Sequence, residues 1–395
     1  MFGSSYFGSS YFGAITDYLL SVYQQFFTFI RSTKAYRGVN LSGNELPYFE
    51  GNTKTTYDYF KLKGLTLIRI PFDWVKIQPV LYDALDETQL AYIDGEVEYA
   101  RLNKMRVILD MHNSGHRGVD AVDSEAVPLA AWSDFWTRLS KRYRDVETVI
   151  GYDHNAPDDL PVPTSTLNYS QAQADANNVP VSTNTKMIQA MLDAVRTNSD
   201  DKYIVAELDN GASIHTFTDS YGIDPNPWIV DTLFNERILY AGHYYFDPDH
   251  SGDYNDFTIP SEETVKYEIK PFLLWCSQNK KPCYIVGYGA PNGSIYTSIL
   301  DYFLSLLDQY EAWATYWAAG NSLSSITTLQ PTSSYNVDRL NITTVTNHLQ
   351  YKQWEREEKP RISDRIMDIT DTWEDYNKQW EDNYTAVERP GSPIY

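Results

Sequence analysis

Residues 149–159 read Val-Ile-Gly-Tyr-Asp-His-Asn-Ala-Pro-Asp-Asp, a short apolar run followed by polar residues and a proline. The run 149–152 predicts a buried strand, because short apolar segments bounded by turn residues are typical of parallel sheets. Asn155, Ala156 and Pro157 then predict a loop at the end of that strand. The stretch therefore indicates one strand-loop unit of an α/β fold.

Seven further β-prone runs lie on either side of this stretch and alternate with longer amphipathic segments, which is the pattern of repeated βα units. The eight strands are expected at residues 36–41, 66–71, 106–112, 148–154, 203–208, 239–245, 282–289 and 312–319. Eight such units predict an α/β fold of the (β/α)8 TIM barrel type, in which functional residues lie at the C-terminal ends of the strands.

The composition is that of a folded, acidic protein. The 395 residues are 42% hydrophobic and 15% aromatic, which is enough for one large buried core. The formal net charge of -21 argues against nucleic acid as a partner, since phosphate binding needs clusters of Lys and Arg. Membrane insertion is not expected, because no apolar run reaches the ~18 residues of a membrane helix. The start of the chain lacks the pattern of a signal peptide, so none is expected.

The two ends of the chain differ from the expected barrel, which we place at residues 31–349. Residues 1–30 combine a Phe-Gly-Ser-Ser-Tyr repeat with a segment of helical periodicity, and predict an aromatic arm. Residues 350–395 are charged, with apolar residues at alternating spacings of four and three, and predict an amphipathic helix that docks on its own barrel or on another subunit. We expect a homo-oligomer joined through these arms. The aromatic residues expected to take part are Tyr6, Tyr11, Trp354, Trp373 and Trp380.

Two kinds of covalent modification are left open by the sequence. Cys276 and Cys283 lie at the end of an expected helix and the start of the next strand, where a disulfide is possible. The pair lacks zinc-ligand spacing, so we expect no metal site, and no cofactor motif is present. Acceptor sequences for N-glycosylation begin at Asn40, Asn168, Asn292, Asn341 and Asn383, but they matter only in a secretory route.

Five motifs follow one another in the expected strands. They are Arg-Gly-Val-Asn at 37–40, Ile-Arg-Ile-Pro-Phe-Asp-Trp at 68–74, Ile-Leu-Asp-Met-His-Asn at 108–113, His-Tyr-Tyr-Phe-Asp-Pro-Asp-His-Ser-Gly at 243–252 and Tyr-Trp-Ala-Ala-Gly at 316–320. Together they resemble glycoside hydrolase family 5, in particular its cellulase-like, endo-β-1,4-glucanase branch. The motif at 243–252 is the most specific, because cellulases of that family carry a similar His-x-Tyr-x-Asp-x-Asp-x-Ser-Gly run. The resemblance covers residues 36–320.

This resemblance implies retaining hydrolysis of a β-glycosidic bond by two Glu side chains. The family takes the acid/base from Asn-Glu-Pro after the fourth strand and the nucleophile from the seventh strand. Here Ala156 and Gly287 stand at those positions, so we expect no catalytic residue and no ordinary family chemistry. The residues that the resemblance marks for carbohydrate binding are Arg69, His112, Asn113, Asn155, His243, Tyr245 and Trp317.

The run Asp153-His154-Asn155 is one residue shorter than the usual family spacing, which favours a natural loss of catalysis over a laboratory substitution. Other carboxylates near strand ends are candidates to replace the missing pair, although such residues more often orient Arg, His or backbone groups. They are Asp110, Asp153, Glu207 and Asp209.

The sequence therefore leaves three functional hypotheses. The first is a non-catalytic barrel that serves as a structural or assembly subunit of a virion, filament or surface layer, with possible binding of a β-linked glycan. The second is a carbohydrate-binding pseudoenzyme that acts alone. The third is an active β-glycosidase with an unusual carboxylate pair. An extracellular or particle-surface location is expected for the first hypothesis.

Overall fold

The computed structural model describes residues 35–47, 51–156, 181–209, 211–217, 228–234, 237–320, 325–332 and 335–349. The chain divides into two compact units, the first ending at Leu349 and the second beginning at Gln350. The aromatic arm and the C-terminal helix expected from the sequence fall outside the described residues and stay predictions. The same holds for the residues assigned to assembly, which are Tyr6, Tyr11, Trp354, Trp373 and Trp380.

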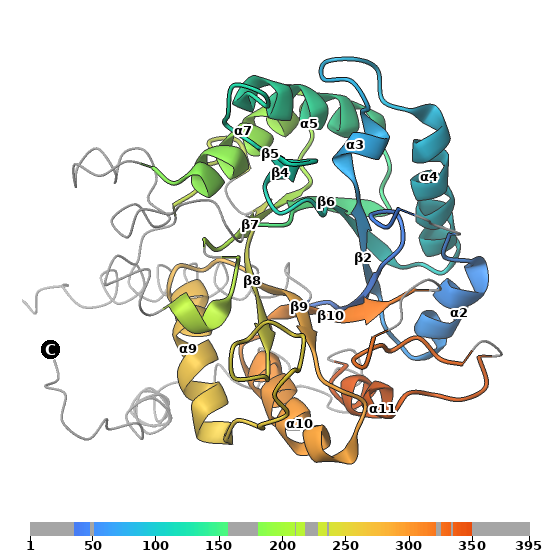
Figure 1. The fold of residues 1–395 in the computed structure, drawn as a ribbon, viewed down its shortest axis with the longest axis vertical. Coiled ribbons are helices and arrows are strands. Elements are labelled where there is room, and N and C mark those ends of the chain that lie inside the picture. Colours follow the sequence, from blue (N-terminus) through green and yellow to red (C-terminus); the bar gives the residue numbers. More distant parts are fainter. Residues whose placement is uncertain are drawn as a thin grey trace, which may run out of the picture. The chain divides into compact units, whose positions relative to one another are not determined.

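Eight parallel strands close into a barrel in the order β1-β10-β9-β8-β7-β6-β3-β2 (Figure 1). Their bounds are β1 Arg37–Leu41, β2 Leu67–Phe72, β3 Arg106–Met111, β6 Val149–His154, β7 Tyr203–Glu207, β8 Ile238–Tyr245, β9 Cys283–Gly289 and β10 Trp313–Ala319. Each strand expected from the sequence is present, with ends that differ by about one residue, within the usual uncertainty of strand boundaries. The predicted (β/α)8 barrel is confirmed.

Helices surround the ring of strands (Figure 1). Their bounds are α2 Lys54–Leu62, α3 Trp74–Ile77, α4 Glu87–Leu102, α5 Leu129–Tyr143, α7 Thr183–Thr197, the 3-10 turn η1 Ile214–Thr216, α9 Glu262–Gln278, α10 Ser294–Gln309 and α11 Leu340–Asn347. Asp86, Ser182 and Ser261 cap α4, α7 and α9, because each side chain accepts a backbone N–H of the first turn. Within the described ranges, no helix combines the length and the apolar character needed to cross a membrane.

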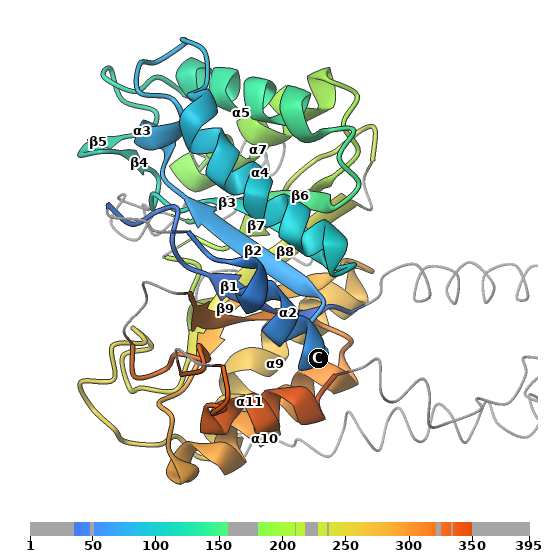
Figure 2. The ribbon, with the colours of Figure 1, turned by 90° about the vertical axis from the view of Figure 1, so that its right-hand side faces the viewer.

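A small antiparallel hairpin, β4 His116–Arg117 and β5 Asp120–Ala121, follows β3. Figure 2 shows it at the end of the barrel toward which the β2 arrow points. This is the C-terminal end of the parallel strands, where barrels of this type place their functional residues.

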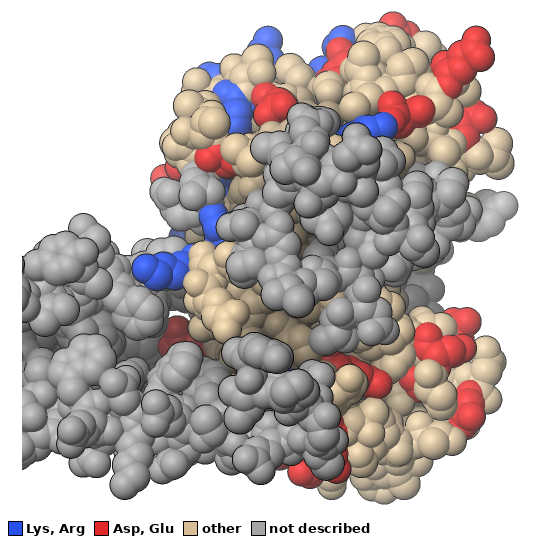
Figure 3. All heavy atoms as spheres, turned by 90° about the vertical axis from the view of Figure 1, so that its left-hand side faces the viewer, with Lys and Arg blue, Asp and Glu red and all other residues tan. Residues whose placement is uncertain are grey.

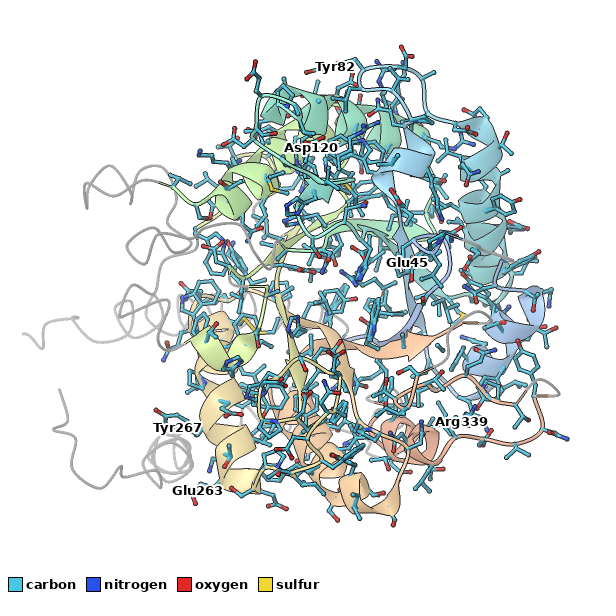
Figure 4. All side chains as sticks on the ribbon, in the orientation of Figure 1. Glu45, Tyr82, Asp120, Glu263, Tyr267 and Arg339 are labelled. Atoms are coloured by element: carbon cyan, nitrogen blue, oxygen red, sulfur yellow. A yellow bond between two sulfur atoms is a disulfide. The ribbon has the colours of Figure 1, made fainter. Side chains whose placement is uncertain are left out.

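Side chains inside the barrel form an apolar layer followed by a charged one. Side chains alternate between the two faces of a strand, so residues two apart share the interior. The apolar interior cluster consists of Leu67, Ile108, Tyr203, Val205, Leu239, Ala241, Tyr284, Val286 and Trp313. Two residues after Leu67, Ile108 and Val205, the inward positions are Arg69, Asp110 and Glu207. Figure 4 shows side chains crowding the interior of the ring, so the barrel is a packed core with a polar end.

Cys276 and Cys283, whose pairing the sequence left open, form a disulfide. The bond joins the last turn of α9 to the first residue of β9. Disulfides form and persist mainly in oxidising compartments. The disulfide is therefore compatible with an oxidising compartment.

Three of the five glycosylation sequences lie in the described part of the chain. In all three, the fold restricts access to the side-chain amide of the Asn. Asn40 and Asn341 are fully buried. The Asn292 amide nitrogen donates hydrogen bonds to the carbonyl oxygens of Ile326 and Thr328, at 3.1 and 2.8 Å. None of these three amides is free to carry a glycan in the folded barrel.

Candidate functional site

The guanidinium of Arg69 lies at the centre of the charged layer, with only 2% of the side chain exposed. It forms ion pairs with Asp110 of β3 at 2.9 Å, Asp153 of β6 at 2.8 Å and Glu207 of β7 at 3.1 Å. Its Nη1 also donates a hydrogen bond to Asn40 Oδ1 of β1 at 3.2 Å. This side chain therefore links its own strand to four others.

The three carboxyls share one guanidinium, and their pKa values are shifted in different directions. Burial raises the pKa of Asp153 to about 7, and the charge of Asp110 adds to the effect while Arg69 opposes it. Burial, followed by the charge of Asp153, raises the pKa of Glu207 well above its usual value. Burial also opposes ionisation of Asp110, but Arg69 and His112 outweigh it and hold the pKa of Asp110 below its usual value. Near neutral pH the layer therefore keeps at least one proton.

A cavity of about 420 Å³ opens above this layer at the C-terminal ends of the strands. This volume is within the usual range for small-molecule sites. It is lined by Arg69, His112, Ser114, Asn155, Glu207, His243, Tyr245, His250, Ser251, Val286, Gly287 and Trp317. Six of the seven residues expected to bind carbohydrate are thus brought together, along with one of the two positions where a catalytic Glu was expected.

Asn113 is the expected carbohydrate-binding residue that the structure places elsewhere. Its Oδ1 accepts a hydrogen bond from the Trp74 backbone N–H at 2.8 Å, at the first residue of α3. Asn113 is not among the described residues that line the cavity. Asn113 lies two residues beyond the end of β3 and supports the start of α3.

The aromatic wall of the cavity is held by ring contacts and by a hydrogen bond. The rings of His112 and Trp317 are stacked, with centroids 4.8 Å apart and planes inclined by 11°. His112 Nδ1 is 2.8 Å from Asp110 Oδ2, which fixes the ring relative to the charged layer. Across the cavity, His243 and Tyr245 have ring centroids 5.4 Å apart. Rings of this kind offer flat faces on which sugars can pack.

The motif at 243–252 forms a loop whose backbone is held by the Asp247 carboxylate. The Asp247 carboxylate accepts the backbone N–H groups of Gly252 and Tyr254 and the hydroxyl of Ser251. Gly252 has a φ of +79°, which favours glycine. This loop holds Tyr245, because a Cβ on Gly252 would lie 3.0 Å from the Tyr245 ring.

Gly287, at the expected nucleophile position, faces the same tyrosine from the other side. A Cβ built on Gly287 would lie 3.0 Å from the Tyr245 hydroxyl and 3.6 Å from the Cβ of His243. The phenol of Tyr245 therefore reaches into the space where a side chain at position 287 would start.

Ala156, at the expected acid/base position, is fully buried. Its backbone N–H donates a hydrogen bond to Glu207 Oε2 at 2.7 Å. Of the neighbouring pair, only Asn155 is among the described residues that line the cavity. Asn155 Oδ1 accepts the Ser114 N–H at 3.1 Å, which fixes its orientation. At the end of β6, residue 155 therefore faces the cavity and residue 156 does not.

Sequence reasoning did not place five of the lining residues in the site, which are Ser114, Glu207, His250, Ser251 and Val286. Glu207 was named only as a substitute carboxylate, although the alternation along β7 puts it in the barrel interior with Val205. His250 and Ser251 belong to the quoted motif, whereas nothing in the sequence singled out Ser114. The fourth substitute carboxylate, Asp209, accepts a hydrogen bond from the Ser182 hydroxyl at 3.2 Å.

Residues 29–323 match the family described as cellulase (glycosyl hydrolase family 5). Because this match covers more than half of the chain, the chain belongs to that family. The manganese dependent endoglucanase Eg5A of Phanerodontia chrysosporium is 23% identical over 273 residues, which are 67% of this chain and 64% of that protein. Endoglucanase 1 of Robillarda sp. (strain Y-20) is 26% identical over 279 residues, which are 65% of each chain. The chain thus spans less than two thirds of the length of these relatives.

Two solved structures share the fold. The endo-β-1,4-glucanase Xac0029 from Xanthomonas axonopodis pv. citri superposes with a TM-score of 0.69 at 24% identity, over 80% of this chain and 99% of that chain. Pseudomonas stutzeri endoglucanase Cel5A, solved with cellobiose, gives a TM-score of 0.68 at 25% identity, over 80% of this chain and 92% of that chain. The barrel found here is therefore a family 5 barrel.

The charged layer is expected to stabilise the folded protein more in mild acid than in mild alkali. The pKa values of Asp153 and Glu207 are raised in the folded state, so between about pH 4 and pH 7 these two carboxyls bind more protons in the folded protein than in the unfolded chain. Their contribution is fully present below the unfolded pKa and is lost as the pH rises through the folded pKa. We expect this contribution to the free energy of unfolding in urea to fall by on the order of 3 kcal/mol between pH 5 and pH 8. His154 and His243, whose pKa values burial lowers to about 4, act in the opposite sense, so the contribution is measured as a difference between the protein and a variant of the layer.

The variant Glu207→Gln should reduce this pH dependence, because it removes one titrating group and keeps an acceptor for the Ala156 N–H. Glu263→Gln, on the exposed side of α9, is the matched control and should leave it unchanged. A pH profile of stability that is unaltered in Glu207→Gln would contradict the assignment.

Proposed function

We propose that this barrel binds a β-linked glycan in its cavity and does not hydrolyse it. The proposal rests on the number of carboxyl groups in the cavity wall and on their hydrogen bonds. Glu207 is the one carboxyl among the described residues that line the cavity, and both of its oxygens are occupied, by Arg69 Nη2 and by the Ala156 N–H. Glycoside hydrolysis by either common mechanism needs two carboxyl groups that flank the scissile bond.

The remaining candidates for catalysis are poorly suited to it. Asp110 and Asp153 pair with Arg69 inside the barrel and are not among the described lining residues. Burial raises the pKa of Tyr245, so its phenol stays neutral and is a weak nucleophile. An active glycosidase with an unusual carboxylate pair therefore has no support from this geometry.

Glycan binding is supported by what the cavity retains. His112, Trp317 and Tyr245 supply ring faces, while Asn155 and Ser251 supply polar groups. Relatives are named endoglucanases, and one solved relative holds cellobiose. Cello-oligosaccharides are thus the first ligands to test. Figure 3 shows that Lys and Arg side chains as well as Asp and Glu side chains lie on the described surface of this side of the molecule.

Substitution of Trp317 tests the binding site directly. Trp317→Ala removes a stacking face and should weaken binding of cellopentaose by about tenfold, measured by isothermal titration calorimetry. Tyr267→Ala is the matched control, because Tyr267 is an aromatic residue of α9 that is 59% exposed and does not line the cavity. The glycan proposal fails if no cello- or manno-oligosaccharide binds at millimolar concentration.

Restoring both Glu side chains should not restore hydrolysis. In Ala156→Glu/Gly287→Glu, the side chain at 156 starts from a buried position beside Glu207, and the side chain at 287 meets the Tyr245 hydroxyl. We expect no release of reducing sugar from carboxymethylcellulose after prolonged incubation. Hydrolysis at a rate typical of the family would show that the site lost nothing except its two carboxyls.

An assembly role is the second function we propose, and it rests on the sequence of the two terminal segments. The disulfide between Cys276 and Cys283 supports an extracellular or particle-surface location. If the arms join subunits, light scattering should detect oligomers of the full chain and a smaller mass after removal of residues 350–395. Monodisperse monomers of the full chain under all conditions would exclude this role.

A further inference from the structure

Two histidine rings join the loops that follow β7 and β8. His215 lies in η1, and its ring is stacked on that of His250, with centroids 4.0 Å apart and planes inclined by 23°. The backbone reinforces the contact, because Ser213 bridges to His243 and the His243 N–H donates to the Ala212 carbonyl oxygen at 2.8 Å. The two loops therefore meet at one ring pair above neighbouring strands.

The geometry around His250 suits a protonated ring. Its Nδ1 is 2.8 Å from the Tyr245 carbonyl oxygen, which only accepts, so Nδ1 carries a hydrogen. Its Nε2 is 3.6 Å from Glu268 Oε1 of α9, so the second nitrogen also faces a negative oxygen. Burial lowers the pKa of His250, but Glu268 and the Tyr245 carbonyl outweigh it and raise that pKa above its usual value.

The stacking of the two rings disfavours a second positive charge on the pair. His215 Nδ1 is 2.6 Å from the Ser213 hydroxyl. His243, on β8, has a pKa lowered to about 4 by burial and by the two other histidines, so it stays neutral near pH 7. A neutral ring stacks well on a cationic one, whereas two cationic rings at this distance repel each other. Glu268 is the acidic group in contact with the pair, and Asp247 acts on His250 from within its own loop.

The ring pair is also part of the cavity wall. His243 and His250 both line the cavity, as does Tyr245, whose carbonyl oxygen holds His250. His215 itself is not among the described lining residues. A movement of His250 away from His215 would therefore change the shape of the cavity without removal of any group that touches the ligand.

We propose that the stacked pair His215–His250 is a pH-sensitive latch that holds the loops after β7 and β8 together as one wall of the cavity. With one proton on the pair the latch is closed. In acid a second proton binds, the rings repel each other, and the wall opens. The consequence for glycan affinity rests on the proposed function, whereas the opening itself does not.

The test uses the full chain and the variant His215→Phe, which keeps a ring to stack on His250 and removes the second titrating group. Affinity for cellopentaose is measured by calorimetry at pH 7.5 and pH 5. We expect the unmodified protein to bind at least tenfold more weakly at pH 5, and His215→Phe to change less than twofold. His348→Phe, which alters a histidine at the end of α11, should behave as the unmodified protein.

A second measurement tests the opening of the latch in the absence of a glycan. Amide hydrogen exchange at residues 211–217 and 246–254, normalised for the intrinsic pH dependence, should show loss of protection at pH 5 in the unmodified protein and retained protection in His215→Phe. Protection that is equal in both proteins at pH 5 overturns the latch. If exchange behaves as expected and no glycan binds at either pH, the latch stands and the proposed glycan function is wrong.

Discussion

The constraint on which the barrel's polar end depends is the enclosure of one guanidinium by three carboxyls. Arg69 cannot lose its charge, and only 2% of its side chain is exposed, so its partners on β3, β6 and β7 must remain. Removing one partner would leave a buried charge poorly compensated. The layer therefore fixes the ends of four adjacent strands, and this requirement persists whether or not the barrel performs chemistry above it.

The charged layer is independent of the side chains at positions 156 and 287. This explains how a cavity like that of the family persists although neither position carries Glu. Ala156 and Gly287 contribute little to the packing of the charged layer, because one donates only its backbone N–H and the other has no side chain. Tyr245, Gly252 and Asp247 hold the loop after β8 by contacts that need neither Glu. The scaffold of the cavity thus holds together without a carboxyl at either position.

Local pattern was sufficient to predict the eight strands, since each is a short apolar run between turn residues. The motifs in the sequence were sufficient to predict that residues such as His243 and Trp317 line the cavity. The position of Asn113 was not predictable, because the turn after β3 decides whether it faces the cavity or the start of α3. The burial of Ala156 and the contact between Tyr245 and position 287 depend on loops from different strands, and no periodicity in the sequence encodes them.

The buried acceptor sequences have a consequence for biosynthesis. Asn40 donates to carbonyl oxygens of β9 and β10 inside the barrel, and Asn341 donates to the Ala290 carbonyl oxygen beneath α11. In a compartment that glycosylates nascent chains, a sugar attached to either amide before folding would prevent β1 or α11 from taking its place. Folding and sugar transfer would then compete for the same nitrogen atoms, so the yield of native protein would depend on which process is faster in the producing cell.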